Sequence, residues 1–526
     1  MGSILNTPQV DRLATLVEEA TRATTGAPGQ FIEPARGTLD RAKARRHHIV
    51  FGRRGSGKTS LLGKAKKDLS RDRRPTAFVD LETFKGHSYP DVLLSILIAT
   101  FRAFDTWLVE AGLNPTNKVS FWKRLGGKPN RPPFNKRRVK EIGQTLKNQI
   151  EDLEAQLHSS DDAALKTTTT RESQSRRGGQ LGVKVGTGTA GVSAGAGAQK
   201  QVALSQCQSE ESRRSKIGFL HRHIMDYQSL FEEIVALAGG NCFVFLDDLY
   251  HIRRSDQPQV IDYFHRIAKG KGVWLKIGTI RHRTEWYRHG DPPIGMKLGD
   301  DCDEIDLDIT LEKYAIAKDF LFKVLGNLID ESGLNSYRSI LADGGVERLV
   351  LASGGVVRDF LTIFRRSIAV GRERLQRGSK SRGDRIGAED VNNAAGEHDT
   401  SKRDELRRDT AEERDALESA FGSVRNFCWD KKANCLLVER DRDTEGMRII
   451  GELVDLRLLH LVASRLTVSG RAGKLYIAYM LDVSQYTGDR KRRDLELIPF
   501  WTKIDRVRRA GLIFDPDDAF SNIISM

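Results

Sequence analysis

The sequence predicts an α/β protein: a parallel β-sheet of about five strands with helices on both faces, then a helical region and a smaller C-terminal α+β module. Strand-like and helix-like segments alternate over residues 46–113 and again over 217–310, as in a parallel sheet covered by helices. A glycine-rich turn joins the first strand to the first helix. The chain has 526 residues, 39% hydrophobic and 30% charged, so it is folded and too long for one core.

The expected elements of the sheet region follow from hydrophobic patterning. A strand over residues 45–51, the glycine-rich turn and a helix from residue 58 come first. The other four expected strands cover residues 75–82, 241–248, 272–280 and 304–308. Apolar helical segments lie between them, beginning with one near Pro90. Residues 1–45 are expected to form an N-terminal helix and a linker.

Residues 114–216 interrupt the alternation with basic, polar and glycine-rich sequence, and we expect an insertion into the first domain. Apolar residues from Val139 to Leu157 recur three or four apart, which predicts an amphipathic helix suited to a coiled-coil hairpin or a partner helix. Residues 167–200 contain few large apolar side chains and predict a disordered segment or a glycine-rich loop. Alternation over residues 181–185 permits a short hairpin there.

Helical segments are expected over 311–396, as a lid on the first domain, and a charged helix over about 402–421. Residues 397–526 form the predicted C-terminal module. A helix over 447–457 precedes two strands joined by a glycine-bearing turn at 469–474. A helix followed by a hairpin is typical of a winged-helix module. The alternative is a three-helix bundle with a decorated loop.

Composition limits the possible partners and the compartment. The 85 Lys and Arg residues exceed the 71 Asp and Glu residues, for a formal net charge of +14, which suits a polyanion such as double-stranded DNA. The five cysteines lack disulfide or zinc spacing, which favours a reducing cytoplasm. The first residues lack a signal-peptide pattern, and no apolar run is expected to reach the length that spans a bilayer, so no membrane partner is expected.

Residues 52–59 fit the phosphate-loop pattern G-x-x-x-x-G-K-[ST] at every position. Its glycines leave backbone N–H groups free to surround phosphates, Lys58 reaches the β- and γ-phosphates, and the Thr59 hydroxyl is a Mg²⁺ ligand. The expected nucleotide-binding residues are Gly52, Arg53, Arg54, Gly55, Ser56, Gly57, Lys58, Thr59 and Ser60. The predicted strand before the loop and the helix after it supply the context that the pattern needs.

Acidic residues at the end of a buried strand predict the second half of such a site. Val244–Asp248 ends in two carboxylates. We expect Asp247 to hold magnesium through water and Asp248 to position or deprotonate the attacking water. The alternative is an acidic turn that caps the next helix.

Four further polar residues are candidates for contact with the phosphates. Thr279, at the end of a neighbouring strand, could orient the attacking water, and Arg281 and Arg283 could serve this γ-phosphate or that of a neighbouring subunit. The alternative is that they cap the strand and pair with nearby acids.

Arg358 opens a helix after Ser353-Gly354-Gly355, where it could contact the phosphates and make the helical region move with the nucleotide. Its alternative is a surface arginine paired with Asp359.

Together these residues resemble the AAA+ ATPases, in the branch that holds the origin-recognition initiators and their STAND-like relatives. The phosphate loop resembles Walker A, Val244–Asp248 resembles Walker B, and Thr279 and Arg358 fall at the sensor 1 and sensor 2 positions. Residues 354–367 and 386–391 resemble the initiator lid, and 31–34 the linker beside the adenine. The resemblance covers about residues 31–395 without the insertion, and it implies ATP, Mg²⁺ and a P-loop NTPase sheet. The Asp-Asp ending departs from the usual Asp-Glu and is also found in STAND proteins.

Three function classes follow. The first is an ATP-hydrolysing, DNA-associated ATPase whose nucleotide state controls conformation or homo-oligomerisation. The second is a STAND-like switch with slow hydrolysis that acts through a partner protein without binding DNA. The third, a small-molecule kinase or GTPase, lacks an Asn-Lys-x-Asp base-reading motif and an evident acceptor site.

Overall fold

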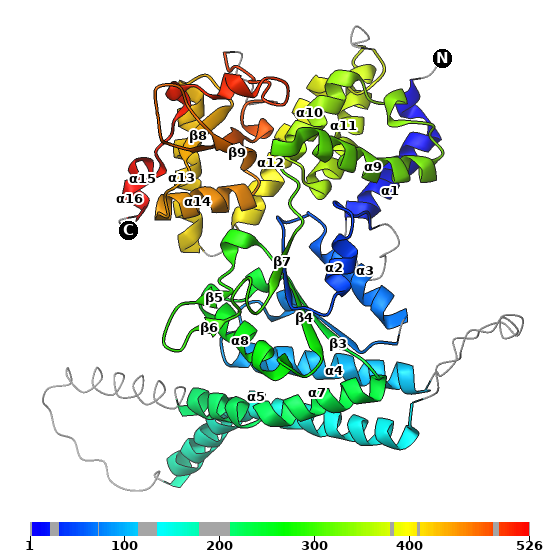
Figure 1. The fold of residues 1–526 in the computed structure, drawn as a ribbon, viewed down its shortest axis with the longest axis vertical. Coiled ribbons are helices and arrows are strands. Elements are labelled where there is room, and N and C mark those ends of the chain that lie inside the picture. Colours follow the sequence, from blue (N-terminus) through cyan, green and yellow to red (C-terminus); the bar gives the residue numbers. More distant parts are fainter. Residues whose placement is uncertain are drawn as a thin grey trace, which may run out of the picture.

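The computed structural model describes residues 3–21, 31–71, 73–113, 134–177, 211–378, 383–407, 411–487 and 494–524. Figure 1 shows a sheet domain in the centre, a helical layer below it, and two regions above it that lie side by side. One upper region is the helical lid with the N-terminal helix, and the other is the C-terminal module. The predicted hairpin over residues 181–185 lies outside the described residues.

The central sheet has five parallel strands. They are β1 (His48–Phe51), β2 (Thr76–Asp80), β3 (Cys242–Asp247), β4 (Val273–Thr279) and β7 (Asp303–Asp306). Their order is β2-β3-β4-β1-β7, and every pairing is parallel. This confirms the predicted parallel sheet of five strands. The carboxyl ends of its strands share one edge, and the loop after β1 lies there.

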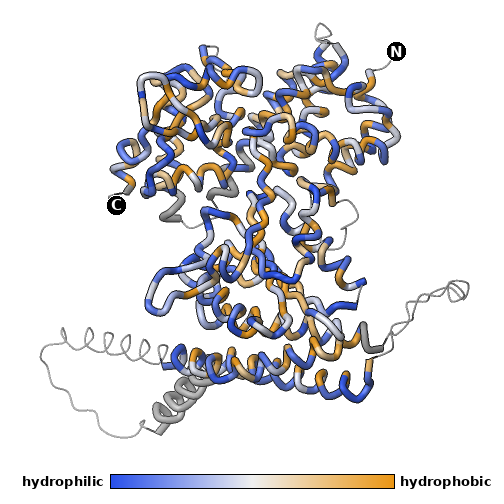
Figure 2. The backbone as a smooth tube through the Cα atoms, viewed as in Figure 1, coloured by the Kyte–Doolittle hydropathy of each residue, from blue (hydrophilic) through white to orange (hydrophobic). Residues whose placement is uncertain are grey.

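Helices cover both faces of the sheet, as predicted. One face packs on α2 (Thr38–Lys43) and α3 (Lys58–Arg71), and the other on α4 (Asp91–Leu113), α7 (Ile224–Ala238) and α8 (Gln257–Ala268). Figure 2 shows hydrophobic residues concentrated in the sheet and along the helices against it. A two-stranded hairpin, β5 (Tyr287–Arg288) with β6 (Ile294–Gly295), lies beside α8 and has no counterpart among the predicted elements.

The predicted amphipathic helix is α5 (Lys136–Arg177), and it packs against α4 and α7. Its apolar residues Ile142, Leu146 and Leu153 are buried in the core on that face of the sheet domain. Lys216, from the other end of the insertion, donates from Nζ to Asp91 Oδ1 and to the Leu157 carbonyl, both at 2.9 Å. The apolar stripe of α5 is therefore occupied within the chain.

Helix α4 contains a segment, residues 91–110, that is long and apolar enough to cross a membrane by length and composition. The expectation that no such run exists is therefore wrong by this criterion. The segment is rich in apolar residues because it packs between β2 and α5 and contributes Leu97, Phe101 and Phe104 to the core. In the structure most of its residues are buried.

The lid consists of α9 (Tyr314–Ser332), α10 (Asp343–Ser353), α11 (Val357–Gln376) and α12 (Ala388–Arg407). Helix α1 (Pro8–Thr21) packs on α9 and α11, so the N-terminal helix belongs to the lid in space. Its buried Val10, Leu13 and Val17 are spaced as one face of a helix.

The C-terminal module has the predicted helix and hairpin. It contains α13 (Ala411–Asp430), β8 (Cys435–Glu439), α14 (Glu445–Asp455), β9 (Leu459–Leu466) and β10 (Tyr476–Leu481), with short helices α15 (Pro516–Ala519) and α16 (Ser521–Ile524) at its end. The strands form an antiparallel sheet in the order β8-β10-β9. This winged-helix-like arrangement confirms the prediction, with α14 as the one helix between β8 and β9.

The charged helix expected over about 402–421 falls on α12 and α13, and the structure describes helix up to Arg407 and again from Ala411. Lys402 of α12 is buried and paired with Asp482, so the charges of this stretch do not all lie on one solvated face. The lid and the C-terminal module also share one continuous hydrophobic core.

Buried histidines in and beside β1 predict a loss of stability in mild acid. Burial lowers the pKa of His47 to about 4, and its Nδ1 lies 3.1 Å from the Leu275 N–H as an acceptor, which requires a neutral ring. The unfolded histidine has a pKa of about 6.5, so between pH 6.5 and 4 the unfolded chain binds a proton that the folded chain refuses. Stability therefore rises with pH across this window and is lost as the pH falls.

We expect the free energy of unfolding to fall by about 1 kcal/mol through His47 when the pH is lowered from 7.5 to 5.5. Urea denaturation of the wild type and of His47→Gln at both pH values measures this, because glutamine retains an acceptor for Leu275. An equal pH dependence in the two proteins would contradict the assignment.

Candidate active site

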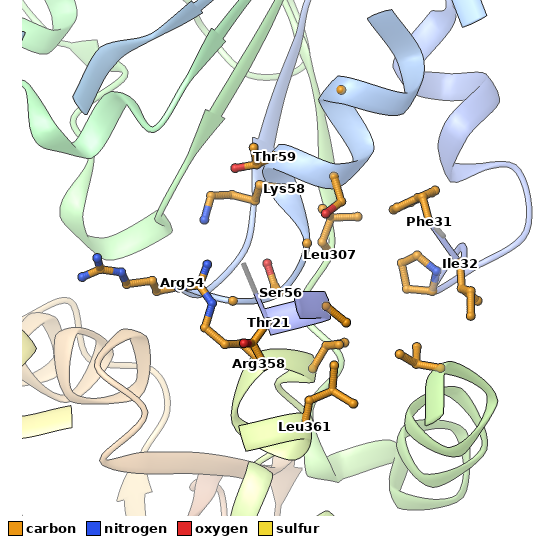
Figure 3. A pocket seen from close by; sticks show the side chains of 18 of the residues that line it. Thr21, Phe31, Ile32, Arg54, Ser56, Lys58, Thr59, Leu307, Arg358 and Leu361 are labelled. Carbon is orange, nitrogen blue, oxygen red and sulfur yellow. The ribbon is translucent and has the colours of Figure 1, made fainter. Parts of the chain in front are cut away.

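The phosphate loop lies at the carboxyl edge of the sheet, between β1 and α3, and faces a cleft of about 990 Å³. Gly55 and Gly57 have φ values of +88° and +101°, which side chains rarely adopt, so the pattern needs glycine at both positions. Residues 54–60 line the cleft. Figure 3 shows Lys58, Thr59 and Arg358 at one end of it and Phe31 and Ile32 at the other.

Lys58 is buried and is held between the loop and the acidic strand end. Its Nζ donates to the Gly52 carbonyl at 3.0 Å and lies 3.9 Å from Asp248 Oδ1. Burial lowers the pKa of Lys58, and the charges of Asp248 and Asp247 oppose that shift. The ammonium is therefore desolvated and close to the loop, as a phosphate ligand must be.

Asp247 is the last residue of β3 and lies next to Thr59. Burial and then the charge of Asp248 raise the pKa of Asp247 to about 7, while a hydrogen bond with Thr59 lowers it. A cation at this carboxylate would offset both the burial of Asp247 and its repulsion by Asp248. Gly278 of β4 makes room for the group, because a Cβ there would lie 2.4 Å from Asp247 Oδ1.

Asp248 adopts a left-handed backbone conformation, with φ +57° and ψ +47°. Aspartate is among the few non-glycine residues that tolerate this region. The conformation places its carboxylate beside Lys58, and both residues line the cleft. The alternative of a helix-capping acidic turn fails for Asp248, since its side chain makes no capping hydrogen bond to the following 3₁₀ turn.

Asp80, Glu82 and Tyr250 are among the cleft residues that sequence reasoning missed. Asp80 ends β2, and the strand register pairs it with Asp247. Burial raises the pKa of Asp80, with a contribution from Asp248. The Tyr250 ring lies 5.6 Å from Lys58 Nζ. The acidic residues at the end of the strand predicted over 75–82 were the available signal for Asp80 and Glu82.

Thr279 and Arg281 are not among the cleft-lining residues. The Thr279 hydroxyl is fully buried and hydrogen-bonded to that of Thr284. The Arg281 guanidinium lies over Phe51, 4.1 Å from the ring centroid, and pairs with acids on β7. Arg283 does not line the cleft either. In this arrangement the structure does not bring these three residues to the phosphate end.

Arg358, by contrast, reaches the cleft from the lid. It lies on the first turn of α11, its side chain lines the cleft, and its N–H donates to the Gly55 carbonyl at 3.3 Å. Gly55 is in close contact with it, because a Cβ there would lie 2.6 Å from Arg358 Cβ. The alternative of a surface arginine paired with Asp359 fails, since Asp359 is fully buried and pairs with Arg457.

Arg53 joins the phosphate loop to the lid instead of lining the cleft. Its guanidinium pairs with Asp308 and donates to the carbonyls of Ile309 and Gly354 at 2.9 and 3.1 Å. The side chain is only 2% exposed. The sequence pattern places Arg53 in the loop but contains no signal for this contact.

The N-terminal segment and the lid also line the cleft. Phe31, Ile32 and Pro34 contribute apolar side chains to it, as do Phe320 and Leu328 of α9. Glu33 points elsewhere, because its carboxylate accepts hydrogen bonds from the N–H groups of Gly37 and Leu39 at the start of α2. The segment expected beside the base therefore lines the cleft at three of its four residues.

The site fits a magnesium nucleotide. The buried hydroxyl of Ser56 has no hydrogen-bond partner in the described part of the chain and lies in the loop. Within the described residues no three His, Cys, Asp or Glu side chains are grouped to cage a metal. Magnesium needs no such cage, because one or two protein oxygens and the substrate phosphates suffice. Thr59 and Asp247 are the residues placed for this.

Comparisons with known proteins give distant neighbours. No protein-family model and no curated protein matches the chain. The solved structures that resemble it are an Orc1, a Cdc6p and a Walker-type ATPase. The Orc1 of Aeropyrum pernix, solved in complex with DNA, has 13% identity and a TM-score of 0.33, over 87% of this chain and 91% of that chain.

The other two neighbours are similarly distant. The Cdc6p of Pyrobaculum aerophilum has 11% identity and a TM-score of 0.28, over 91% of this chain and 88% of that chain. The Walker-type ATPase PABY2304 of Pyrococcus abyssi has 12% identity and a TM-score of 0.37, over 85% and 93%. Because all three TM-scores lie below 0.5, the fold assignment rests on the strand order and the phosphate loop.

Gly278→Ala is expected to lower nucleotide turnover about 100-fold, because its methyl group must displace the Asp247 carboxylate by about an ångström. A steady-state phosphate-release assay measures this. Gly326→Ala on α9 is the matched control, since a Cβ there meets nothing within 4 Å. Equal turnover in the two variants would show that the position of Asp247 does not matter for catalysis.

Proposed function

We propose that this chain is a magnesium-dependent ATPase of the AAA+ type whose nucleotide state controls the placement of its lid and C-terminal module. The observation that carries the proposal is one cleft that joins Lys58, Asp247 and Asp248 of the sheet domain to Arg358 of the lid. A site shared by two regions suits a conformational cycle better than chemistry on a metabolite. The apolar side chains of the cleft, Phe31 among them, supply a surface for the base.

The chain's own groups have distinct tasks in this proposal. Backbone N–H groups of residues 55–59 and the ammonium of Lys58 bind the phosphates, while Arg358 binds them from the opposite wall. Asp248 accepts the proton of the attacking water. Thr59 and Asp247 would hold magnesium, which would supply positive charge beside the phosphate oxygens. Thr279 and Arg281 remain predictions that require movement of the β4 end or a second subunit.

Titration calorimetry with ATP, ADP and GTP, each with and without magnesium, tests nucleotide binding. We expect ATP to bind with magnesium and the affinity to fall when magnesium is chelated. Phosphate release above the background of a Lys58→Ala preparation tests hydrolysis. A wild-type protein that binds no nucleotide would overturn the proposal.

Association with double-stranded DNA is the second part of the proposal, supported by the net charge of +14. Exposed cations lie on the β9–β10 hairpin, where Arg465, Arg471 and Lys474 are outside the core. Helix α14 is a poor candidate for groove contact here, because most of it is buried and it carries Glu445, Glu452 and Asp455. We therefore assign backbone contact to the hairpin.

Fluorescence anisotropy with a DNA duplex over a range of salt concentrations tests this assignment. Each lost phosphate contact lowers the slope of log K against log salt by about 0.9. Arg471→Ala is expected to lower this slope by about 0.9. Arg508→Ala serves as the control, because the Arg508 side chain pairs with Asp505. An unchanged slope in Arg471→Ala would remove the hairpin from the interface.

The buried position of α14 favours a second candidate, a STAND-like switch that acts through a partner protein. Its N-terminal face packs on α15, and its C-terminal end packs on the 3₁₀ turn η7 (Arg281–Arg283) of the sheet domain. Retention of ADP after purification, slow turnover and no DNA binding at moderate salt would select this candidate. Homo-oligomerisation is a prediction in both cases, and light scattering with ATP tests it.

A further inference from the structure

A group of buried charges surrounds Asp359, the residue next to Arg358. Asp359 Oδ1 lies 2.6 Å from Arg457 Nη1 and 3.2 Å from His398 Nε2. Its other oxygen lies 3.5 Å from Lys402 Nζ. Asp359 is on α11 and the His398–Lys402 pair is on α12, whereas Arg457 lies between α14 and β9 in the C-terminal module.

The same group extends deeper into the C-terminal module. Lys402 Nζ lies 2.8 Å from Oδ2 of Asp482, which follows β10. That oxygen is also 2.8 Å from His460 Nε2 on β9. The side chains of Lys402, His460 and Asp482 are each no more than 2% exposed. We call the set Asp359, His398, Lys402, Arg457, His460 and Asp482 the buried charge network.

The network is strongly polarised. Burial alone would raise the pKa of Asp359, but Arg457 and Lys402 outweigh it and hold the pKa well below its usual value. Burial would likewise raise the pKa of Asp482. Lys402 and His460 outweigh this effect, so the pKa of Asp482 is also lowered. Burial lowers the pKa of His460, and its hydrogen bond with Asp482 opposes that shift. These ion pairs are fully desolvated, and removal of one partner leaves an uncompensated charge.

The network adjoins the segment that reaches the nucleotide cleft. Gly354 has φ +56°, and a Cβ there would lie 1.9 Å from His460 Nδ1, so the C-terminal module touches the backbone just before α11. On the cleft side, Arg53 holds the Gly354 carbonyl and Gly55 accepts from the Arg358 N–H. Residues 354–359 are therefore held by the phosphate loop on one side and by the C-terminal module on the other.

A second contact joins the C-terminal module to the sheet domain. Asp455 Oδ2 accepts a hydrogen bond from the His282 N–H at 2.8 Å, in the turn after β4. Gly451 lies against the same histidine, since a Cβ there would be 2.7 Å from His282 Nδ1. A shift of Arg457 would therefore also shift α14 against η7.

We propose that Arg457 and Lys402 are positioning residues for Arg358, and that the buried charge network makes the C-terminal module respond to the γ-phosphate of the nucleotide in the cleft. The inference rests on the proposed function, because it requires ATP at that site. Arg358 moves with the first turn of α11, and Asp359 on that turn transmits the movement to Arg457. Networks of paired buried charges suit such a role because their members have few alternative arrangements.

The first test measures the ratio of dissociation constants for ADP and for adenylyl-imidodiphosphate, with magnesium, in the full chain. Arg457→Gln is expected to lower the preference for the triphosphate analogue over ADP about fivefold or more, while the affinity for ADP stays near that of the wild type. Arg457→Lys, which keeps the charge, is expected to restore part of it. Arg442→Gln, which breaks an exposed pair with Asp515 in the same module, is the control and is expected to keep the wild-type ratio.

The second test uses the wild type and does not depend on whether Arg457→Gln folds. Hydrogen exchange of residues 445–466 is compared with the analogue and with ADP bound. We expect different protection in the two states, and no difference in Arg358→Ala. Equal protection in the wild type, or an unchanged ratio in a folded Arg457→Gln, would overturn the inference and leave the ATPase intact. Absence of any nucleotide binding would instead overturn the proposed function and the inference with it.

Discussion

Lys58→Ala is expected to lower affinity for magnesium-ATP about 100-fold and to abolish measurable turnover. The wild-type ammonium is buried beside Asp248, where a desolvated positive charge interacts strongly with phosphate. No other lysine lines the cleft among the described residues, so the loss is not compensated. Calorimetry with ATP and a phosphate-release assay measure the two effects.

Lys64→Ala is the matched control for this substitution. Lys64 lies on the same helix, α3, and pairs with Asp68 at 3.1 Å outside the cleft. Its removal is expected to leave affinity and turnover within twofold of the wild type, since a partly exposed pair contributes little. Similar losses in both variants would indicate damage to α3 instead of loss of a phosphate ligand.

Asp247→Asn is expected to lower turnover at least about 100-fold and to remove most of its dependence on magnesium. The amide keeps the size of the carboxylate and a hydrogen-bonding oxygen near Thr59 but loses the charge that a divalent cation needs. Asp248→Asn is expected to differ, with ATP and magnesium bound but not hydrolysed. Single-turnover phosphate release over a magnesium titration separates the two results.

Asp300→Asn, which removes an exposed carboxylate that pairs with Lys297, is the control for both acidic variants. The two roles are assigned wrongly if Asp247→Asn keeps its magnesium dependence while Asp248→Asn loses it. Full turnover in Asp248→Asn would indicate another base. Asp80 is then the first candidate, since it lines the same cleft and is paired in register with Asp247.

The sheet and the phosphate loop could be predicted because their signals are local. Three glycines, a lysine and a threonine within eight residues identify the loop, and Asp247 ends β3 after five apolar residues. Asp80 also lies at the end of a predicted strand, but its place beside Asp247 was not predicted, because it depends on the register of β2 on β3. The position of Thr279 was predictable, but its hydroxyl bond to Thr284 depends on the path of the chain after β4.

The lid illustrates the other limit of the sequence. Arg358 was expected at the phosphates from its place on the first turn of a helix, and its side chain does line the cleft. Nothing in the sequence separates Asp359 from an ordinary surface acid, because its partners Arg457 and Lys402 lie 98 and 43 residues away. A charged stretch near residue 402 likewise indicates a solvated helix until the fold buries one of its lysines.

The continuous core of the lid and the C-terminal module bears on how this chain can be divided. Leu351 and Phe360 of the lid belong to the same apolar cluster as Leu453 and Leu459 of the module. A chain ended near residue 396 would expose that cluster to water and leave Asp359 without Arg457. Removal of the C-terminal module therefore does not yield a minimal ATPase, and a truncated protein that aggregates would reveal nothing about whether DNA or a partner binds there.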